Sequence, residues 1–200
     1  MKKLPKISFD QIKNQQIVDL RSQKEFQQGY LAGALNLTPK NLLKYGKQLL
    51  NNKKEVILIT TEENQKELSD LVEEAKNQDI KNITGYLLVE EVPTEGLKTI
   101  PTISAENFMT LEGDYNLLDV RHSDEITRPA PEKNLVNIPL EDLTDQFSQL
   151  NSKKTVYTLC GSGGRATAAA SYLKNQGYQT TVIEGGIGAI EALKNSHDKH

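Results

Sequence analysis

The sequence predicts an α/β protein made of two similar domains in tandem, each with a central, mainly parallel sheet flanked by helices. Three observations lead to this fold class. A pattern of residues occurs twice, with an offset of one hundred positions. Short apolar runs alternate with helical stretches in both copies, and turn-forming residues separate the copies. Strand–helix–strand order needs crossover connections, which favour parallel pairing.

The repeat is visible at four stations that follow one another in the same order in both copies. Ile-Val-Asp-Leu-Arg in the first copy matches Leu-Leu-Asp-Val-Arg in the second. The stations pair residues 17–21 with 117–121, Glu25 with Glu125, residues 56–59 with 156–159, and residues 83–85 with 183–185. Such agreement predicts two copies of one structural unit.

The elements of each copy follow from local pattern. Residues 8–12 and 104–108 are expected to open the copies as short helices, because each begins with a serine placed to cap the first turn. The apolar, β-branched runs are typical of buried strands. Residues 65–75 and 165–176 place apolar side chains on one helical stripe, which predicts a helix between two strands of each sheet.

A boundary between the domains is expected within residues 90–102. This segment contains Pro93, Gly96 and Pro101, which interrupt regular structure and favour a linker. The predicted domains are therefore residues 1–92 and residues 101–200.

Composition restricts the classes of function. The formal net charge of −3 provides no large positive field, so neither nucleic acid nor an anionic membrane is an expected partner. No apolar run is long enough to cross a membrane, and the first residues lack an apolar signal core, so we expect a cytoplasmic protein. The chain has one cysteine and three scattered histidines, and we expect no metal site.

The single cysteine, Cys160, is the strongest candidate for chemistry. It ends a predicted strand and is followed by Gly161, Ser162, Gly163, Gly164 and Arg165, before the next helix. The glycines allow positive φ, so that successive N–H groups converge above the sulfur. The helix dipole favours the thiolate, and Arg165 offers a fork-shaped contact for an anionic donor. This site requires a sulfur that solvent can reach. A lone buried cysteine without chemistry is the alternative.

These motifs resemble those of the rhodanese superfamily, whose active-site loop reads Cys, four residues, Arg. Asp119-Val120-Arg121 and Glu184-Gly185-Gly186 are similar to two further stations of that family. In the first copy, Gly-Tyr-Leu-Ala-Gly-Ala-Leu-Asn at residues 29–36 resembles the family's Gly-His-Ile-x-Gly-Ala-x-Asn segment. The chain is identified as a tandem rhodanese.

The resemblance implies a sulfurtransferase. Cys160 would take a sulfane sulfur from thiosulfate or a low-molecular-weight persulfide and pass it to a thiol, sulfite or cyanide. Residues 161–164 and Arg165 would bind the donor, and the only intermediate group would be the persulfide on Cys160, without a cofactor. Two alternatives stay open. One is a persulfide relay or binding module that serves a partner protein. The other is a phosphatase or arsenate reductase, although those enzymes place five residues between Cys and Arg.

The resemblance also implies that the first copy is inert. At its matching station, Thr60 stands opposite Cys160 and Gln65 opposite Arg165, while Glu62 and Glu63 add negative charge. An inert copy before an active one is similar to the C-terminal pair of fusions that begin with a metallo-β-lactamase-fold persulfide dioxygenase. A persulfide dioxygenase is therefore an expected partner or fused neighbour.

Secondary candidates lie near the predicted loop. Arg128 is a possible second anion contact, in a segment, residues 127–133, that departs from the family pattern. Asp119 and Arg121 have either a catalytic role or, as we favour, a structural one that joins strand ends to loops. His122 is either a base near the thiol or a solvated loop residue.

Overall fold

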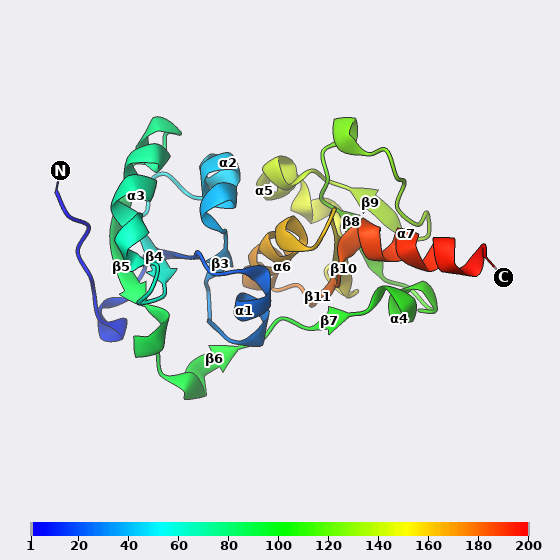
Figure 1. The fold of residues 1–200 in the computed structure, drawn as a ribbon, viewed down its shortest axis with the longest axis horizontal. Helices are drawn as coiled ribbons and strands as arrows, with labels where there is room; N and C mark the ends of the chain where they lie inside the picture. Colours follow the sequence, from blue (N-terminus) through cyan, green and yellow to red (C-terminus); the bar gives the residue numbers. More distant parts are fainter. Residues whose placement is uncertain (1, 200) are drawn as a thin grey trace. The chain divides into compact units, whose positions relative to one another are not determined.

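The computed structural model describes residues 2–199. The chain divides into two compact units, Met1–Thr99 (unit 1) and Ile100–His200 (unit 2). Each unit has its own parallel sheet and helices (Figure 1). The predicted fold class, α/β with two mainly parallel sheets flanked by helices, is therefore confirmed.

The sheet of unit 1 has four parallel strands in the order β3-β1-β4-β5. The strands are β1 (Gln16–Asp19), β3 (Leu35–Asn36), β4 (Val56–Thr60) and β5 (Ile83–Leu88). All five residues of β4 are buried, as expected for a central strand whose two faces are both covered.

Helices and short turns connect these strands. The longest helix of unit 1, α2, begins where the Thr38 hydroxyl accepts the Asn41 N–H and Pro39 fixes the first helical φ. Figure 1 labels α1 (Gln23–Gln28), α2 (Pro39–Leu49) and α3 (Leu68–Asn77); the 3-10 turns are η1 (Phe9–Gln11), η2 (Gln65–Glu67), η3 (Val89–Glu91) and η4 (Thr94–Gly96). A two-stranded antiparallel pair joins β2 (Tyr30–Leu31) to β6 (Leu97–Lys98).

The sheet of unit 2 has five parallel strands in the order β7-β11-β10-β8-β9. The strands are β7 (Thr102–Ile103), β8 (Asn116–Asp119), β9 (Leu135–Asn137), β10 (Val156–Leu159) and β11 (Thr180–Ile183). The carboxyl ends of parallel strands meet at one edge, so the segments after β8, β9, β10 and β11 come together there.

The two faces of the unit 2 sheet are covered by different helices. Alternate strand residues such as Leu117, Leu159 and Ile183 pack in one cluster with side chains of α4 and α7. The helix α6 contacts β10 and β11. The helices are α4 (Ala105–Met109), α5 (Leu143–Gln146), α6 (Gly164–Asn175) and α7 (Gly186–His197), with 3-10 turns η5 (Ser123–Glu125), η6 (Leu140–Asp142) and η7 (Phe147–Gln149).

The sequence repeat is reproduced in the hydrogen bonds of the two units. The Gln16 amide nitrogen donates to the carbonyls of Asn51 and Lys54, and the Asn116 amide nitrogen donates to those of Asn151 and Lys154. Gln16 thus links the start of β1 to the turn before β4, and Asn116 links the start of β8 to the turn before β10. The two units share this contact at positions one hundred residues apart.

The predicted linker is more ordered than expected. Residues 90–102 contain η4, the strand β6 and the first residue of β7. β6 pairs with β2, and Leu97 packs beside Gly29, where an added Cβ would lie 3.3 Å from the leucine Cδ1. Two-residue strands depend on distant partners and leave no periodic signal in the sequence. The predicted helix over 65–75 is likewise split, because it begins as the 3-10 turn η2 before α3.

Candidate active site

Cys160 lies directly after β10, at the carboxyl edge of the unit 2 sheet. Residues 160–163 form a short loop that leads into α6. β10 is the central strand of five, and Leu159 is fully buried, so the cysteine is attached to the buried centre of the sheet.

Two backbone amides point at the sulfur. The Gly163 N–H donates to Cys160 Sγ at 3.0 Å, and the Ala166 N–H donates at 3.3 Å. The second donor belongs to the first turn of α6, whose positive dipole end is therefore directed at the same atom. Hydrogen bonds and dipole both stabilise negative charge on sulfur, and the thiolate is the nucleophilic form.

The backbone route to this arrangement depends on one glycine of the loop. The sequence allows a positive φ at Gly161, Gly163 and Gly164, and only Gly163 has one, at 111°. Gly164 is already the first residue of α6. One left-handed residue before the helix is enough to turn the amides toward the sulfur.

Cys160 is less accessible than the sequence interpretation requires. The residue is only 1% exposed. A donor the size of thiosulfate does not reach such a sulfur unless the residues at the rim of the loop move. The exposed rim includes Ser162, together with the partly exposed Arg165.

The loop rests on the turn that follows β11. The Ile187 N–H donates to the Cys160 carbonyl at 2.8 Å, and the Gly188 N–H donates to the Gly161 carbonyl at 3.4 Å. Gly186 has a φ of 59°, and a Cβ placed there would lie 2.3 Å from the Cys160 oxygen. The sequence pattern indicates this glycine only as part of the Glu184-Gly185-Gly186 station, without a role. Because Gly186 has no side chain, the turn after β11 can lie directly against the backbone of Cys160 and Gly161.

Arg165 pairs with Glu125. The Arg165 Nη1 donates to Glu125 Oε1, and the same oxygen accepts the His122 N–H at 3.0 Å. We expected Arg165 to be available for an anionic donor, but its guanidinium already faces a carboxylate. Glu125 was noted only as the partner of Glu25 in the repeat, because a contact across forty residues leaves no local signal.

His122 is held by acidic neighbours at the rim. Its Nδ1 accepts the Asp124 N–H at 3.2 Å, which leaves the proton of the neutral ring on Nε2. Nε2 lies 3.6 Å from Glu141 Oε1, and Nδ1 lies 3.5 Å from Asp124 Oδ2. Both ring nitrogens are therefore directed at neighbouring residues.

Asp119 and Arg121 form a buried ion pair below the rim. The Arg121 Nε and Nη2 both donate to the Asp119 carboxylate, the shortest distance being 2.8 Å. The Arg121 Nη1 donates to the carbonyl of Arg128 at 2.9 Å, so the pair also holds the segment before β9. The Arg128 residue itself is exposed. These contacts give Asp119 and Arg121 a structural role.

The matching station of unit 1 has a different chemistry. Thr60 ends β4, and the Glu62 N–H donates to both carboxylate oxygens of Glu90, at 3.1 and 3.3 Å. Gln65 accepts the Tyr86 hydroxyl at 3.1 Å. A loop amide here thus binds a carboxylate of its own unit, and the position of the nucleophile is a threonine.

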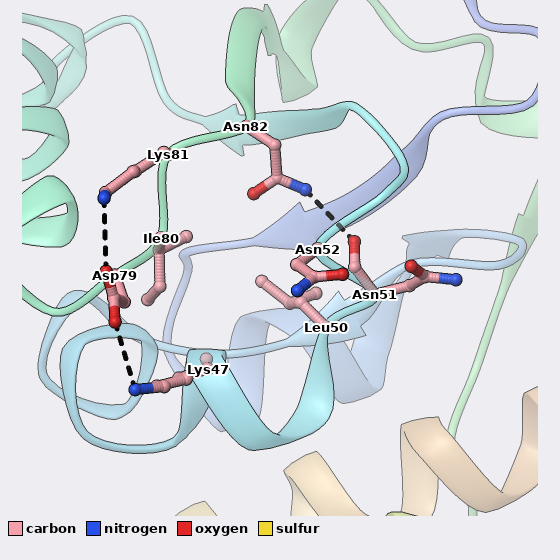
Figure 2. Close-up of a pocket in the computed structure, with 9 residues that line it drawn as sticks. Lys47, Leu50, Asn51, Asn52, Asp79, Ile80, Lys81 and Asn82 are labelled. Carbon is pink, nitrogen blue, oxygen red and sulfur yellow. Dashed lines mark hydrogen bonds and ion pairs between the residues drawn. The ribbon is translucent and has the colours of Figure 1, made fainter.

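Unit 1 also has a hollow of about 780 Å³ at the opposite end of its strands (Figure 2). It is lined by Gly46, Lys47, Leu50, Asn51, Asn52, Asp79, Ile80, Lys81 and Asn82. Lys47 and Lys81 flank Asp79 and hold the pKa of its carboxyl below the ordinary value, mainly through hydrogen bonds. The lining contains no thiol or imidazole.

The rest of residues 2–199 adds neither a metal centre nor a membrane segment. Within that range, no three His, Cys, Asp or Glu side chains are grouped closely enough to hold a metal ion. None of the helices there has the length and apolar character needed to cross a bilayer.

Comparison with protein families gives two matches in this chain. The model described as Rhodanese-like domain matches residues 7–87 and again residues 104–193. The matches fall one in each unit.

Individual relatives cover about half of the chain. YrkF of Bacillus subtilis, provisionally named a sulfur carrier protein, is 33% identical over 95 residues, which are 46% of this chain and 51% of YrkF. YtwF of the same organism, provisionally named a sulfurtransferase, is 28% identical over 48% of this chain and 91% of YtwF. This chain therefore spans about half the length of YrkF. Among solved structures, a rhodanese-related protein from Thermoplasma volcanium has 29% identity and a TM-score of 0.41, covering 46% of this chain and 92% of that chain.

Proposed function

Because the chain belongs to the rhodanese-like domain family, with one such domain in each unit, we propose that unit 2 transfers sulfane sulfur through a persulfide on Cys160. Sulfur transfer is the function that family membership supports. The observation that carries the assignment to Cys160 is the pair of amides, Gly163 N–H and Ala166 N–H, that donate to its sulfur. A buried thiol with only a packing role has no need of them.

The proposed cycle has two steps. In the first, the Cys160 thiolate attacks the outer sulfur of a donor, a new S–S bond forms, and the donor's own S–S bond breaks. The electron pair leaves on sulfite, if the donor is thiosulfate, or on a thiolate, if it is a persulfide. In the second step, a thiol, sulfite or cyanide takes the outer sulfur and restores the Cys160 thiolate. The covalent intermediate divides one difficult transfer into two easier displacement reactions. No cofactor takes part in the proposed cycle.

The loop residues have separate roles in this cycle. The amides that point at the Cys160 sulfur would stabilise the thiolate and then the charged persulfide, because they are fixed before the reaction begins. Residues 161–164 form the wall nearest the incoming donor, and Arg165 stands at its edge. Since Cys160 is 1% exposed, binding of a donor must displace part of this wall. Ser162 is exposed and Arg165 is partly exposed, so the displacement would involve these two residues.

Intact-mass measurement tests the proposal. After exposure to thiosulfate or glutathione persulfide, the wild-type protein should gain about 32 Da, one sulfur atom, and Cys160→Ser should gain nothing. The added mass should disappear when cyanide or a thiol is supplied. If none of these donors adds sulfur to folded wild-type protein, the proposal is wrong.

A persulfide relay is the second candidate. It is favoured by the likeness to YrkF, which is provisionally named a sulfur carrier. In a relay, Cys160 would load once and pass sulfur to a partner protein, with negligible turnover on small acceptors. Comparing steady-state cyanide turnover with the single-turnover loss of sulfur to a protein thiol separates the two functions.

A further inference from the structure

Glu125 is fixed beside Arg165 by the backbone as well as by the ion pair. Its side chain accepts the His122 N–H, while the His122 ring accepts a backbone N–H of the same turn, so that the two residues cap η5 reciprocally. The carboxylate therefore keeps its position when Arg165 moves. Glu125 is thus a fixed residue of the rim, held by the capping interactions of η5.

This carboxylate changes the charge that a donor meets. A Cys160 thiolate, the Arg165 guanidinium and the Glu125 carboxylate together carry one negative charge. Asp124 and Glu141, which face His122, add further negative charge at the same rim. The first turn of α6 contributes a partial positive charge that already acts on the sulfur. Cys160 is buried, so water screens the charge on its sulfur weakly, whereas Glu125 is exposed and Arg165 partly exposed, so their charges are screened by water and by added salt.

The two classes of donor differ in charge at the reacting end. Thiosulfate is a dianion, and its leaving group is sulfite, which also carries two negative charges. A low-molecular-weight persulfide, RSS⁻ or RSSH, carries one charge or none on its sulfurs, and its leaving group is a thiolate with one. In both reactions Cys160 gains one sulfur and one S–S bond is exchanged for another.

We propose that Glu125 determines donor specificity, by neutralising Arg165 and so favouring a persulfide over thiosulfate. This inference rests on the proposed function, since it concerns the first step of the Cys160 cycle. The arginine would bind a dianion well if it stood alone. Paired with Glu125, it presents little net charge to a second anion.

The test is the ratio of kcat/KM for thiosulfate to kcat/KM for glutathione persulfide. Glu125→Gln keeps an oxygen that accepts the His122 N–H but removes the charge, and should raise this ratio about tenfold. Arg165→Gln leaves the carboxylate uncompensated, and should lower the ratio by a similar factor of about ten. Glu125→Asp keeps the charge and should leave the ratio near the wild-type value.

A matched control is available in the inert unit. Glu25 occupies the same station and accepts the Ser22 hydroxyl at 3.0 Å, so Glu25→Gln removes the same charge far along the chain from Cys160. The ratio should not change. For the wild type, raising ionic strength from about 0.02 to about 0.3 M should increase the thiosulfate rate, because screening weakens like-charge repulsion.

The outcomes separate this inference from the proposed function. If no donor loads Cys160, the proposed function fails. If donors load Cys160 but the wild type prefers thiosulfate, or Glu125→Gln lowers both reactions equally, Glu125 only positions Arg165 and the specificity inference is wrong. If a variant does not fold, the salt dependence of the wild type decides: a thiosulfate rate that falls as salt is added overturns the inference.

Discussion

Gly186 sets the position of the loop that contains Cys160. A methyl group at this residue would lie 2.3 Å from the Cys160 carbonyl oxygen, and its φ of 59° disfavours any other side chain. Gly186→Ala should therefore push the loop away from the turn after β11. We expect a loss of about 2–4 kcal/mol in unfolding free energy, from strain and overpacking, and much slower loading of Cys160.

Gly188→Ala is the matched control for that change. Its Cβ would lie 3.8 Å from the Gly161 oxygen, an ordinary contact, and the residue is inside α7, where alanine is favoured. Urea unfolding and mass-detected loading should leave this variant close to the wild type. Equal damage by both substitutions would contradict the account of Gly186.

Arg121 should contribute to stability rather than to chemistry. Arg121→Ala leaves Asp119 as a buried carboxylate without its ion partner, which should cost about 3–5 kcal/mol of unfolding free energy. It also frees the Arg128 carbonyl, so amide exchange should increase near β9. Arg128→Ala keeps that carbonyl and should change neither quantity. An Arg128→Ala variant that loads thiosulfate much more slowly would instead support the anion contact expected from sequence.

At the scale of elements, β10, the strand that leads to Cys160, contains one buried polar atom that lacks a hydrogen bond among the described residues. The Thr158 side chain is fully buried, and its hydroxyl has no hydrogen-bond partner among the residues that the structure describes. Valine has nearly the same shape without the polar atom. Thr158→Val should raise the unfolding free energy by about 1 kcal/mol.

The neighbouring strand supplies the comparison for Thr158→Val. Thr180 of β11 is also buried, but its hydroxyl donates to the Ala170 carbonyl at 3.4 Å. Thr180→Val should therefore give no gain in stability. Urea denaturation of both variants measures the two changes in unfolding free energy. If Thr180→Val is stabilised and Thr158→Val is destabilised, the explanation based on the unbonded Thr158 hydroxyl is wrong.

At the scale of the whole molecule, the two units differ at the matching station, because unit 2 has Cys160 where unit 1 has Thr60. Thr60→Cys, made together with Cys160→Ser, places a thiol at the matching station of unit 1. We expect no added sulfur after exposure to glutathione persulfide, because the loop there carries Glu62 and Glu63 and already binds the Glu90 carboxylate. Intact mass gives the answer, and a gain of about 32 Da would contradict the inert reading of unit 1.

Much of the fold was predictable, because the sequence pattern occurs twice and because apolar residues recur with the periods of strands and helices. The apolar runs around Val56 and Val156 became parallel strands, and the stripe after Arg165 became α6 almost to the residue. The strands β6 and β7 were missed because two residues carry no period. Tertiary pairing, not local preference, places them.

The candidate site was predictable only in part. The sequence indicates the cysteine, the helix behind it and the arginine, since these are consecutive. It does not show that Glu125 meets Arg165, or that Gly186 touches the loop, because both contacts join segments far apart in the chain. The sequence also does not show which loop glycine takes a positive φ, since glycine permits this conformation without requiring it, and only Gly163 adopts it.

The pairing of β7 with β11 has a consequence for how unit 2 forms during synthesis. Thr102, at the start of the unit, is paired in register with Val182, near its far end. While the ribosome is still making the intervening residues, the first strand has no partner and its polar backbone stays hydrated. The edge of the sheet can close only after β11 has left the exit tunnel, and such long-range closure is slow. The turn that supports the Cys160 loop follows β11, so the surroundings of this cysteine are among the last parts to be completed.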